Sequence, residues 1–183
     1  IAGLDATTES MALTRDRSFT FAIDRLDEDE TAGQLAAASA LARQLRQVVV
    51  PEVDAWVYAK MCAGAGQKPA AVALTKDNLY AKIIAGTNAL DNAEAPDTGR
   101  VLLVTPDTYL LMKQSPDIVM ETDVGNDMRL KGVIGNLDGM TVIRVPASRL
   151  PVKFGFLIAH PVATVAPTKL ADYRTHKDPP GIS

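Results

Sequence analysis

Nucleophilic catalysis would have to begin at Cys62 or at a serine, and either would need a histidine as base and a carboxylate to orient that base. The chain has one cysteine and two histidines, His160 and His176. Cys62 stands among apolar residues near the expected end of a helix, and His160 directly precedes a proline at the expected end of a strand. We therefore interpret Cys62 and His160 as packed structural residues, and we expect His176 to carry no chemistry.

Pairs of acidic residues are the second candidates for chemistry. Asp24 lies close to Asp27 in the sequence, and Glu121 lies close to Asp123. Two carboxylates can share acid–base work, but neither pair has the histidine or further carboxylates that a metal site requires. A single cysteine also excludes a multi-thiolate zinc site. We interpret the first pair as a helix cap and the second as exposed loop acids, and we predict no catalytic, cofactor-binding or metal site.

The glycines of residues 132–139, GVIGNLDG, suggest a nucleotide-binding loop at first sight. The dinucleotide fingerprint requires G-x-G-x-x-G between a strand and a helix, whereas these glycines flank two expected strands. No lysine follows a glycine-rich loop in the way a phosphate-binding loop needs. We interpret these glycines as residues of turns next to the strands.

Composition excludes two further classes of protein. The 183 residues carry 19 basic and 22 acidic side chains, a net charge of −3, whereas a dedicated nucleic-acid binder usually carries a basic stripe. The short basic segment at residues 174–177 is interpreted as a solvated turn. No apolar run approaches the roughly 20 residues that span a bilayer, so we expect no membrane contact. The 47% hydrophobic content suits one large globular domain or two small ones.

Residues 24–66 are predicted to form one long, kinked helix around which the rest is organised. Asp27 and Glu30 have the spacing of a capping box. Pro51 lacks an N–H and predicts a kink or restart, and two glycines predict the end of the helix through a left-handed cap. About 35 helical residues would reach about 50 Å, which is typical of a strut. An apolar stripe that needs a surface to lie against recurs at helical spacing: Leu35, Ala38, Ala42, Leu45 and Val49.

Strands and shorter helices are predicted on both sides of this helix. Residues 13–23 alternate in the manner of a half-buried strand, with Phe19, Phe21 and Ile23 on one face. Thr75 is expected to cap a second helix whose apolar face consists of Leu79, Ile83, Thr87 and Leu90. A short apolar strand at residues 101–104 is then expected to lead into a helix that opens at Thr105 and a proline and ends at Pro116.

The C-terminal third is predicted to be an exposed loop followed by strands. Residues 117–131 show no period and are expected to form the loop. A hairpin is expected over 133–146, with its turn at 136–139, a glycine at positive φ, and the side chains of Met140, Val142 and Ile143 packed. Buried strand 154–159 and extended segments 162–165 and 170–174 complete the pattern. The combination predicts an α+β fold.

The order of these parts resembles the major capsid (coat) proteins of tailed double-stranded DNA bacteriophages over about residues 17–178. The resemblance is carried by FTFAI at 19–23, DEDET at 27–31, VPEVDA at 50–55, AKM at 59–61 and GMTVIRVP at 139–146. It implies a long spine helix, an elongated antiparallel sheet and an inserted axial α/β domain. Residues 1–23 would be the end of an extended loop and an entry strand. Residues 24–66 and 160–183 would form the peripheral domain, and residues 67–159 the axial domain.

The resemblance also implies a function. The chain would be a structural subunit of an icosahedral phage or prophage capsid, made in the bacterial cytoplasm and found in the virion. Its partners would be copies of itself in hexamers and pentamers, with scaffolding and portal proteins as further partners. The shell would enclose DNA without sequence-specific binding. The chain would not be an enzyme, and it would need no cofactor.

Two departures from the family pattern predict that the chain is a fragment. Family members normally have an N-terminal arm and a complete extended loop before the matching strand, and they continue with a further strand beyond the position of Ser183. The alternative functions are a small α/β enzyme or a ligand-binding module, in which the loop at residues 117–131 would lie over the site.

Overall fold

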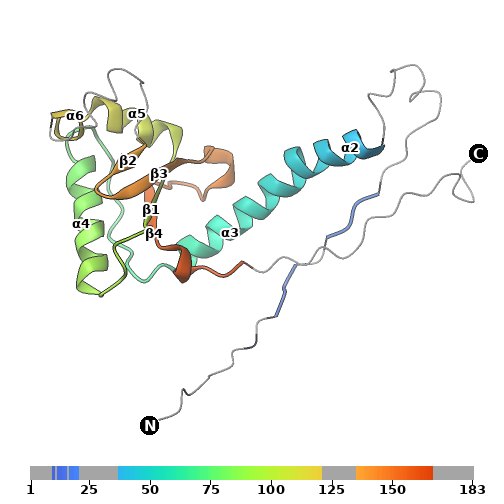
Figure 1. Cartoon of the computed structure of the whole chain (residues 1–183). Helices are drawn as coiled ribbons and strands as arrows, with labels where there is room; N and C mark the ends of the chain where they lie inside the picture. The colour runs from blue at the N-terminus through green and yellow to red at the C-terminus, as the bar shows by residue number, and fades with distance from the viewer. Residues whose placement is uncertain (1–9, 11, 16, 21–36, 121–134, 167–183) are drawn as a thin grey trace, which may run out of the picture. The chain divides into compact units, whose positions relative to one another are not determined.

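The computed structural model describes residues 10, 12–15, 17–20, 37–120 and 135–166 (Figure 1). The chain divides into two compact units, one of Ile1–Arg43 with Pro167–Ser183 and one of Gln44–Ala166. The predicted strand at 13–23 falls in the first unit. Residues 12–15 and 17–20 have no regular secondary structure, so the strand is wrong there, and residues 21–23 lie outside the described residues. Alternating side chains favour a strand only where a neighbouring backbone pairs with it.

Helical residues follow one another without a break from Ala37 to Gly64. They form α2 (Ala37–Gln44), the π-helix η1 (Leu45–Val49) and α3 (Val50–Gly64). The Val50 N–H donates to the carbonyl oxygen of Leu45, five residues back, so the wider turn lies directly before Pro51. The predicted helix is therefore confirmed over 37–64, and so is its irregularity near Pro51. Residues 24–36, with the predicted cap at Asp27 and Glu30, lie outside the described residues.

Two details of this helix differ from prediction. α3 ends at Gly64, but through an extended Ala65 with φ −57° and ψ 129°, and not through a left-handed glycine. The ammonium group of Lys68 donates to the carbonyl oxygen of Ala63, which satisfies one terminal carbonyl without a glycine cap. The stripe was expected to be buried, yet Ala42 is exposed, and η1 and α3 contain no buried residue.

A four-stranded sheet forms the centre of the second unit. Its order is β2 (Asn136–Leu137), β3 (Met140–Arg144), β1 (Val101–Val104) and β4 (Phe156–Ala159). β1 pairs with β3 in parallel and with β4 antiparallel. The sheet is therefore mixed, because the helices between β1 and β3 return the chain in the same direction. An elongated antiparallel sheet is not among the described residues.

Three helices accompany the sheet: α4 (Leu79–Asn92), α5 (Pro106–Gln114) and α6 (Pro116–Met120) (Figure 1). The strand at 101–104 and the helix opened by Thr105 are confirmed, and the Thr108 N–H donates to Thr105 Oγ1 at 3.1 Å. α6 makes the loop prediction wrong for residues 117–120, and the rest of that loop is outside the described residues. The core joins helices and sheet through Leu79, Ile83, Leu102, Val104, Tyr109, Met112, Ile118, Leu137 and Met140.

Short polar residues form the start of α4 and the turn of the hairpin. α4 begins after Asn78, whose Oδ1 accepts the Thr75 N–H at 2.9 Å, so the predicted cap at Thr75 is wrong by one turn. The hairpin is confirmed, with Asp138 at φ 49° and Gly139 at φ 72° between β2 and β3. Positive φ at both central residues is typical of a type I′ turn. Ile143 is 39% exposed, so its predicted packing is wrong.

The last described segments close the second unit. β4 confirms a strand within 154–159, although its four residues are only half-buried. Residues Pro161–Ala163 form the 3-10 helix η3, so the extended segment predicted at 162–165 is wrong at its start. The cause is local, because Pro161 favours a helical first turn and His160 Nδ1 accepts the Val162 N–H. The extended segment predicted at 170–174 lies outside the described residues.

Candidate subunit-contact surface

Helix α3 is apolar around most of its circumference, yet the chain buries none of its residues. Its fifteen residues include only three charged side chains, Glu52, Asp54 and Lys60. A helix of this composition is normally buried on all sides. Exposed valines follow one another at the junction of η1 and α3: Val48 at 46%, Val50 at 47% and Val53 at 40%. Val50 and Val53 are three residues apart and so share one side of the helix, whereas Val48 belongs to η1 and does not face the same way. We call Val50 and Val53 the α3 valine surface, and such a surface is typical of a protein contact.

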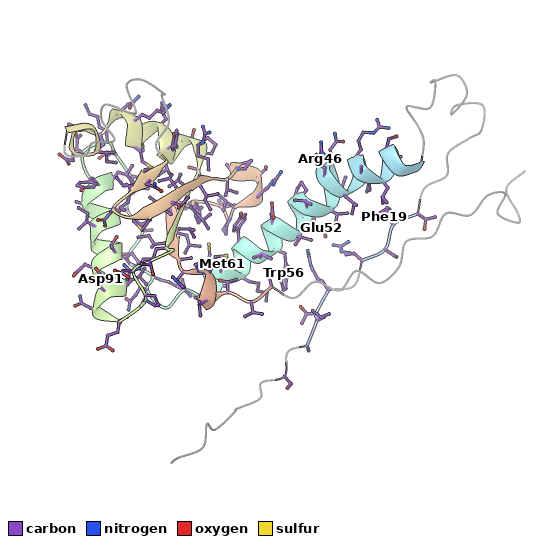
Figure 2. All side chains as sticks on the ribbon, in the orientation of Figure 1. Phe19, Arg46, Glu52, Trp56, Met61 and Asp91 are labelled. Carbon is purple, nitrogen blue, oxygen red and sulfur yellow. The ribbon has the colours of Figure 1, made fainter. Side chains whose placement is uncertain are left out.

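The middle of α3 adds an aromatic residue to this helix. Figure 2 shows Arg46 in η1 and Glu52, Trp56 and Met61 along α3. Trp56 is half-buried, and Lys60 Nζ lies 5.6 Å from the centroid of its ring. Large aromatic side chains are enriched at protein interfaces because they bury much area at little entropic cost. Trp56 therefore adds a partly exposed aromatic side chain to the apolar residues of the α3 valine surface.

One ion pair ties α3 to the remainder of the second unit. Arg149 Nη1 lies 2.7 Å from Asp54 Oδ2, and Arg149 ends the 3-10 helix η2 (Ala147–Arg149). Tyr58 stands one turn after Asp54, and burial raises the pKa of its phenol; the Asp54 charge adds to the rise and the Arg149 charge opposes it. The ion pair of Asp54 with Arg149 joins one side of α3 to η2.

A shallow hollow of about 390 Å³ lies beside η2. Its rim carries Val152, which is 92% exposed, and Lys153, which has φ 63°. Positive φ is uncommon for a residue other than glycine, and here it occurs in the turn next to the exposed Val152. The lining is mainly apolar: Val72, Leu74, Thr105, Asp107, Thr108, Leu111, Ala147, Leu150, Pro151, Val152, Lys153, Phe154 and Gly155. Its two charged side chains do not form a set for acid–base or nucleophilic chemistry.

The structure places two of the candidates for chemistry. Cys62 is half-buried in α3, and burial raises the pKa of its thiol, which lowers the fraction of reactive thiolate. His160 Nδ1 accepts the Val162 N–H at 3.2 Å, so a neutral ring carries its proton on Nε2, which donates to the Thr98 carbonyl oxygen at 3.0 Å. Both ring nitrogens of His160 are therefore occupied: Nε2 joins the end of β4 to the loop before β1, and Nδ1 accepts a local hydrogen bond from η3.

The remaining candidates are not brought together by the described residues. Asp24, Asp27, Glu121, Asp123 and His176 lie outside them, as do residues 132–134, and residues 136–139 form the hairpin. The part of the chain that is described holds no group of three His, Cys, Asp or Glu side chains suited to a metal ion. No helix in the same part is long and apolar enough to cross a membrane.

Two polar groupings were missed by sequence reasoning. The ion pair of Asp54 with Arg149 joins residues 95 positions apart, and no local pattern signals it. Lys113 and Arg144 both lie over the ring of Tyr109. The spacing of Tyr109 and Lys113, four residues apart on a predicted helix, is the one signal that could have indicated the second grouping.

Comparison with known proteins decides the family. The model of the phage capsid protein family matches residues 7–180. The chain belongs to the phage capsid protein family. The resemblance to bacteriophage capsid proteins is thereby confirmed, and the family supports a structural role in a phage capsid. A search of the curated proteins finds no match.

A solved structure shows that the fold is shared. A chain from Mycobacterium phage Che8 is similar to this capsid protein with a TM-score of 0.61 at 21% sequence identity. The similarity covers 77% of this chain and 52% of the phage chain, so the capsid protein matches about half the length of that relative. The mixed helix and sheet of the described residues agrees with the α+β class that we predicted.

Proposed function

We propose that this capsid protein is a structural subunit of an icosahedral shell, in which copies of the chain form hexamers and pentamers around the phage DNA. The observation that supports this most directly is α3, an apolar helix without a buried residue. Exposing such a helix to water is unfavourable, at roughly 25 cal/mol for each Å² of apolar area. Contact with neighbouring copies removes that area from water.

The same proposal assigns roles to the parts of the chain. Residues 24–66 and 160–183 form a peripheral domain with the long helix as its spine, and residues 67–159 form an axial domain. Residues 1–23 contribute the end of an extended loop and an entry strand. Supporting this division, the core cluster of the second unit draws its residues from between Leu79 and Met140, and none of them comes from α3.

The proposal excludes catalysis and sequence-specific recognition as the main role. DNA is enclosed without base readout, scaffolding and portal proteins are further partners, and no membrane is involved. The subunit is made in the bacterial cytoplasm and ends in the virion. Supporting this, burial reduces the reactivity of Cys62, and hydrogen bonds occupy both ring nitrogens of His160. The alternative site under a loop at 117–131 stays untested, because residues 121–131 lie outside the described residues.

The test is assembly of the full gene product, followed by electron microscopy and sedimentation velocity. We expect shells or capsomers from the wild type and a loss of both from Val50→Asp/Val53→Asp with folding retained. The matched control is Ala81→Asp/Ala85→Asp, which adds the same charge at two exposed positions of α4. A wild type that remains monomeric at all protein and salt concentrations contradicts the proposal. Assembly of the valine variant at wild-type levels removes α3 from the contact.

A further inference from the structure

Two cations lie over a single aromatic ring at one side of the second unit. Lys113 Nζ is 5.2 Å from the centroid of the Tyr109 ring, and the guanidinium carbon of Arg144 is 4.7 Å from it. Lys113 follows Tyr109 by one turn of α5, and Arg144 is the last residue of β3. The ring itself is 5% exposed, while Arg144 is exposed. We call Lys113 and Arg144 the cation pair.

The cation pair is suited to an anion from outside the chain. Within the described residues, no ion pair joins Lys113 or Arg144 to a carboxylate. Because each cation lies about 5 Å from the same ring centroid, the two charges are at most about 10 Å apart, and attraction to the aromatic ring offsets part of their mutual repulsion. Carboxylates of a partner that approach both cations would relieve the remaining repulsion.

An acidic counterpart lies in the loop between α4 and β1. The last turn of α4 and this loop carry Asp91, Glu94 and Asp97 within seven residues. Arg100 is 3% exposed and lies 2.7 Å from Asp91, and it also donates to two carbonyl oxygens of the loop. Arg100 thus neutralises one carboxylate and fixes the loop. Glu94 and Asp97 are exposed, and neither has an ion-pair partner among the described residues.

The two charged features lie on different sides of the second unit. In Figure 1, α5 is at the top and α4 runs down the left side, and Figure 2 places Asp91 at the lower end of α4. One copy therefore cannot join its own two features, but the cation pair of one copy can meet the acidic loop of the next. Repetition of such a head-to-tail contact closes into a ring when the rotation between copies permits.

We propose that the cation pair Lys113 and Arg144 of one copy binds Glu94 and Asp97 of a neighbouring copy, and that this contact sets the order of subunits in a capsomer. The inference rests on the proposed function, because it specifies a surface for the self-association described there. DNA phosphate is the other chemistry that two cations attract. The net charge of −3 and the presence of only two cations in the cluster favour a carboxylate partner.

Charge exchange provides the test on the full gene product. Lys113→Glu/Arg144→Glu and Glu94→Lys/Asp97→Lys each place like charges in the contact, and each is expected to weaken capsomer association by roughly tenfold or more at low salt. An equimolar mixture of the two variants is expected to recover association in hexamers, where the variants can alternate so that every contact joins opposite charges. The chain carrying all four substitutions should recover as well. Association is measured by sedimentation velocity, with electron microscopy of the products.

Two controls separate the contact from general effects. Lys76→Glu/Lys82→Glu makes the same change of net charge as Lys113→Glu/Arg144→Glu at two exposed positions, one in the turn before α4 and one in α4, and should associate like the wild type. Lys113→Gln/Arg144→Gln removes the charges without reversing them, so its loss of association should be smaller. Thermal unfolding of each variant establishes that Tyr109 remains packed beneath the substituted residues.

The outcomes are distinct. Recovery in the fourfold variant supports the contact. The contact is overturned, and the proposed function stands, if the wild type forms shells and both twofold charge-reversal variants also assemble normally. The same conclusion follows if the fourfold variant associates no more strongly than either twofold variant. Shells of Lys113→Glu/Arg144→Glu that assemble normally but retain less DNA show a phosphate partner and also overturn it. A wild type that never assembles overturns the proposed function and this contact with it.

Discussion

Separating Asp54 from Arg149 should loosen α3 from the second unit by a measurable amount. Their charged atoms are 2.7 Å apart, and their side chains are 32% and 31% exposed. Coulomb's law in water gives about 1.5 kcal/mol at this distance, and a lower local dielectric would increase it. Partial exposure and the entropy of holding both side chains reduce the net value, so we expect a coupling free energy of about 1 kcal/mol.

A double-mutant cycle measures this coupling directly. Asp54→Asn, Arg149→Gln and the double variant keep side-chain size while removing the charges. Free energies of unfolding come from denaturant titrations, and the coupling is the departure of the double variant from additivity. Hydrogen exchange of the α3 amides should rise in each single variant, because the ion pair joins α3 to η2.

Tyr58 provides an independent readout of the same charges. Asp54 raises the pKa of Tyr58 and Arg149 lowers it, so Asp54→Asn should lower this pKa and Arg149→Gln should raise it. Ultraviolet titration, with Tyr58→Phe as the blank, resolves the change. A coupling below about 0.2 kcal/mol, together with an unchanged Tyr58 titration, would show that the ion pair does not hold α3.

Three further predictions concern stability. Leu102→Ala in β1 should cost about 2 to 5 kcal/mol in unfolding free energy, because Leu102 is fully buried, whereas Leu110→Ala at a 54% exposed position should cost under about 1. Gly139→Ala should cost about 1 kcal/mol by denaturant titration, since φ is 72° there, and an unchanged midpoint would contradict the turn geometry. Burial raises the pKa of the Tyr58 phenol above its ordinary 10.0, so the unfolded chain releases this proton at a lower pH than the folded chain. The free energy of unfolding should therefore fall as the pH rises above about 10. Tyr58→Phe should remove the part of this fall that Tyr58 causes.

Elements defined by neighbouring residues could be predicted from the sequence. Thr105 followed by proline marks the start of α5, because a hydroxyl cap and a first-turn proline both favour a helix there. Asp138 and Gly139 mark the hairpin because few residues adopt positive φ readily. Pro51 marks the irregular turn through its missing N–H, which the structure places at η1. In each case the determining atoms lie within one turn of the chain.

Features that depend on distant residues could not be predicted in this way. The parallel pairing of β1 with β3 depends on where α5 and α6 return the chain, which no alternation of side chains encodes. α6 was missed because Pro116 was interpreted as the end of a helix, although proline is equally suited to a first turn. The ion pair of Asp54 with Arg149 depends on the packing of η2 against α3. Periodicity identified α3 as a helix but could not show that, in the described part of the chain, none of its residues is fully buried.

In the proposed subunit, folding and assembly draw on different residues. The core that fixes the second unit comes from the sheet and helices α4 to α6, whereas α3 contributes no buried side chain. Local stability depends on buried apolar contacts, so α3 should open at a lower free energy than β1 in the isolated chain. A neighbour that covers the α3 valine surface binds the folded helix and not the open one, so it stabilises α3 by mass action. Assembly should therefore slow hydrogen exchange in α3 far more than in β1, which the core already protects.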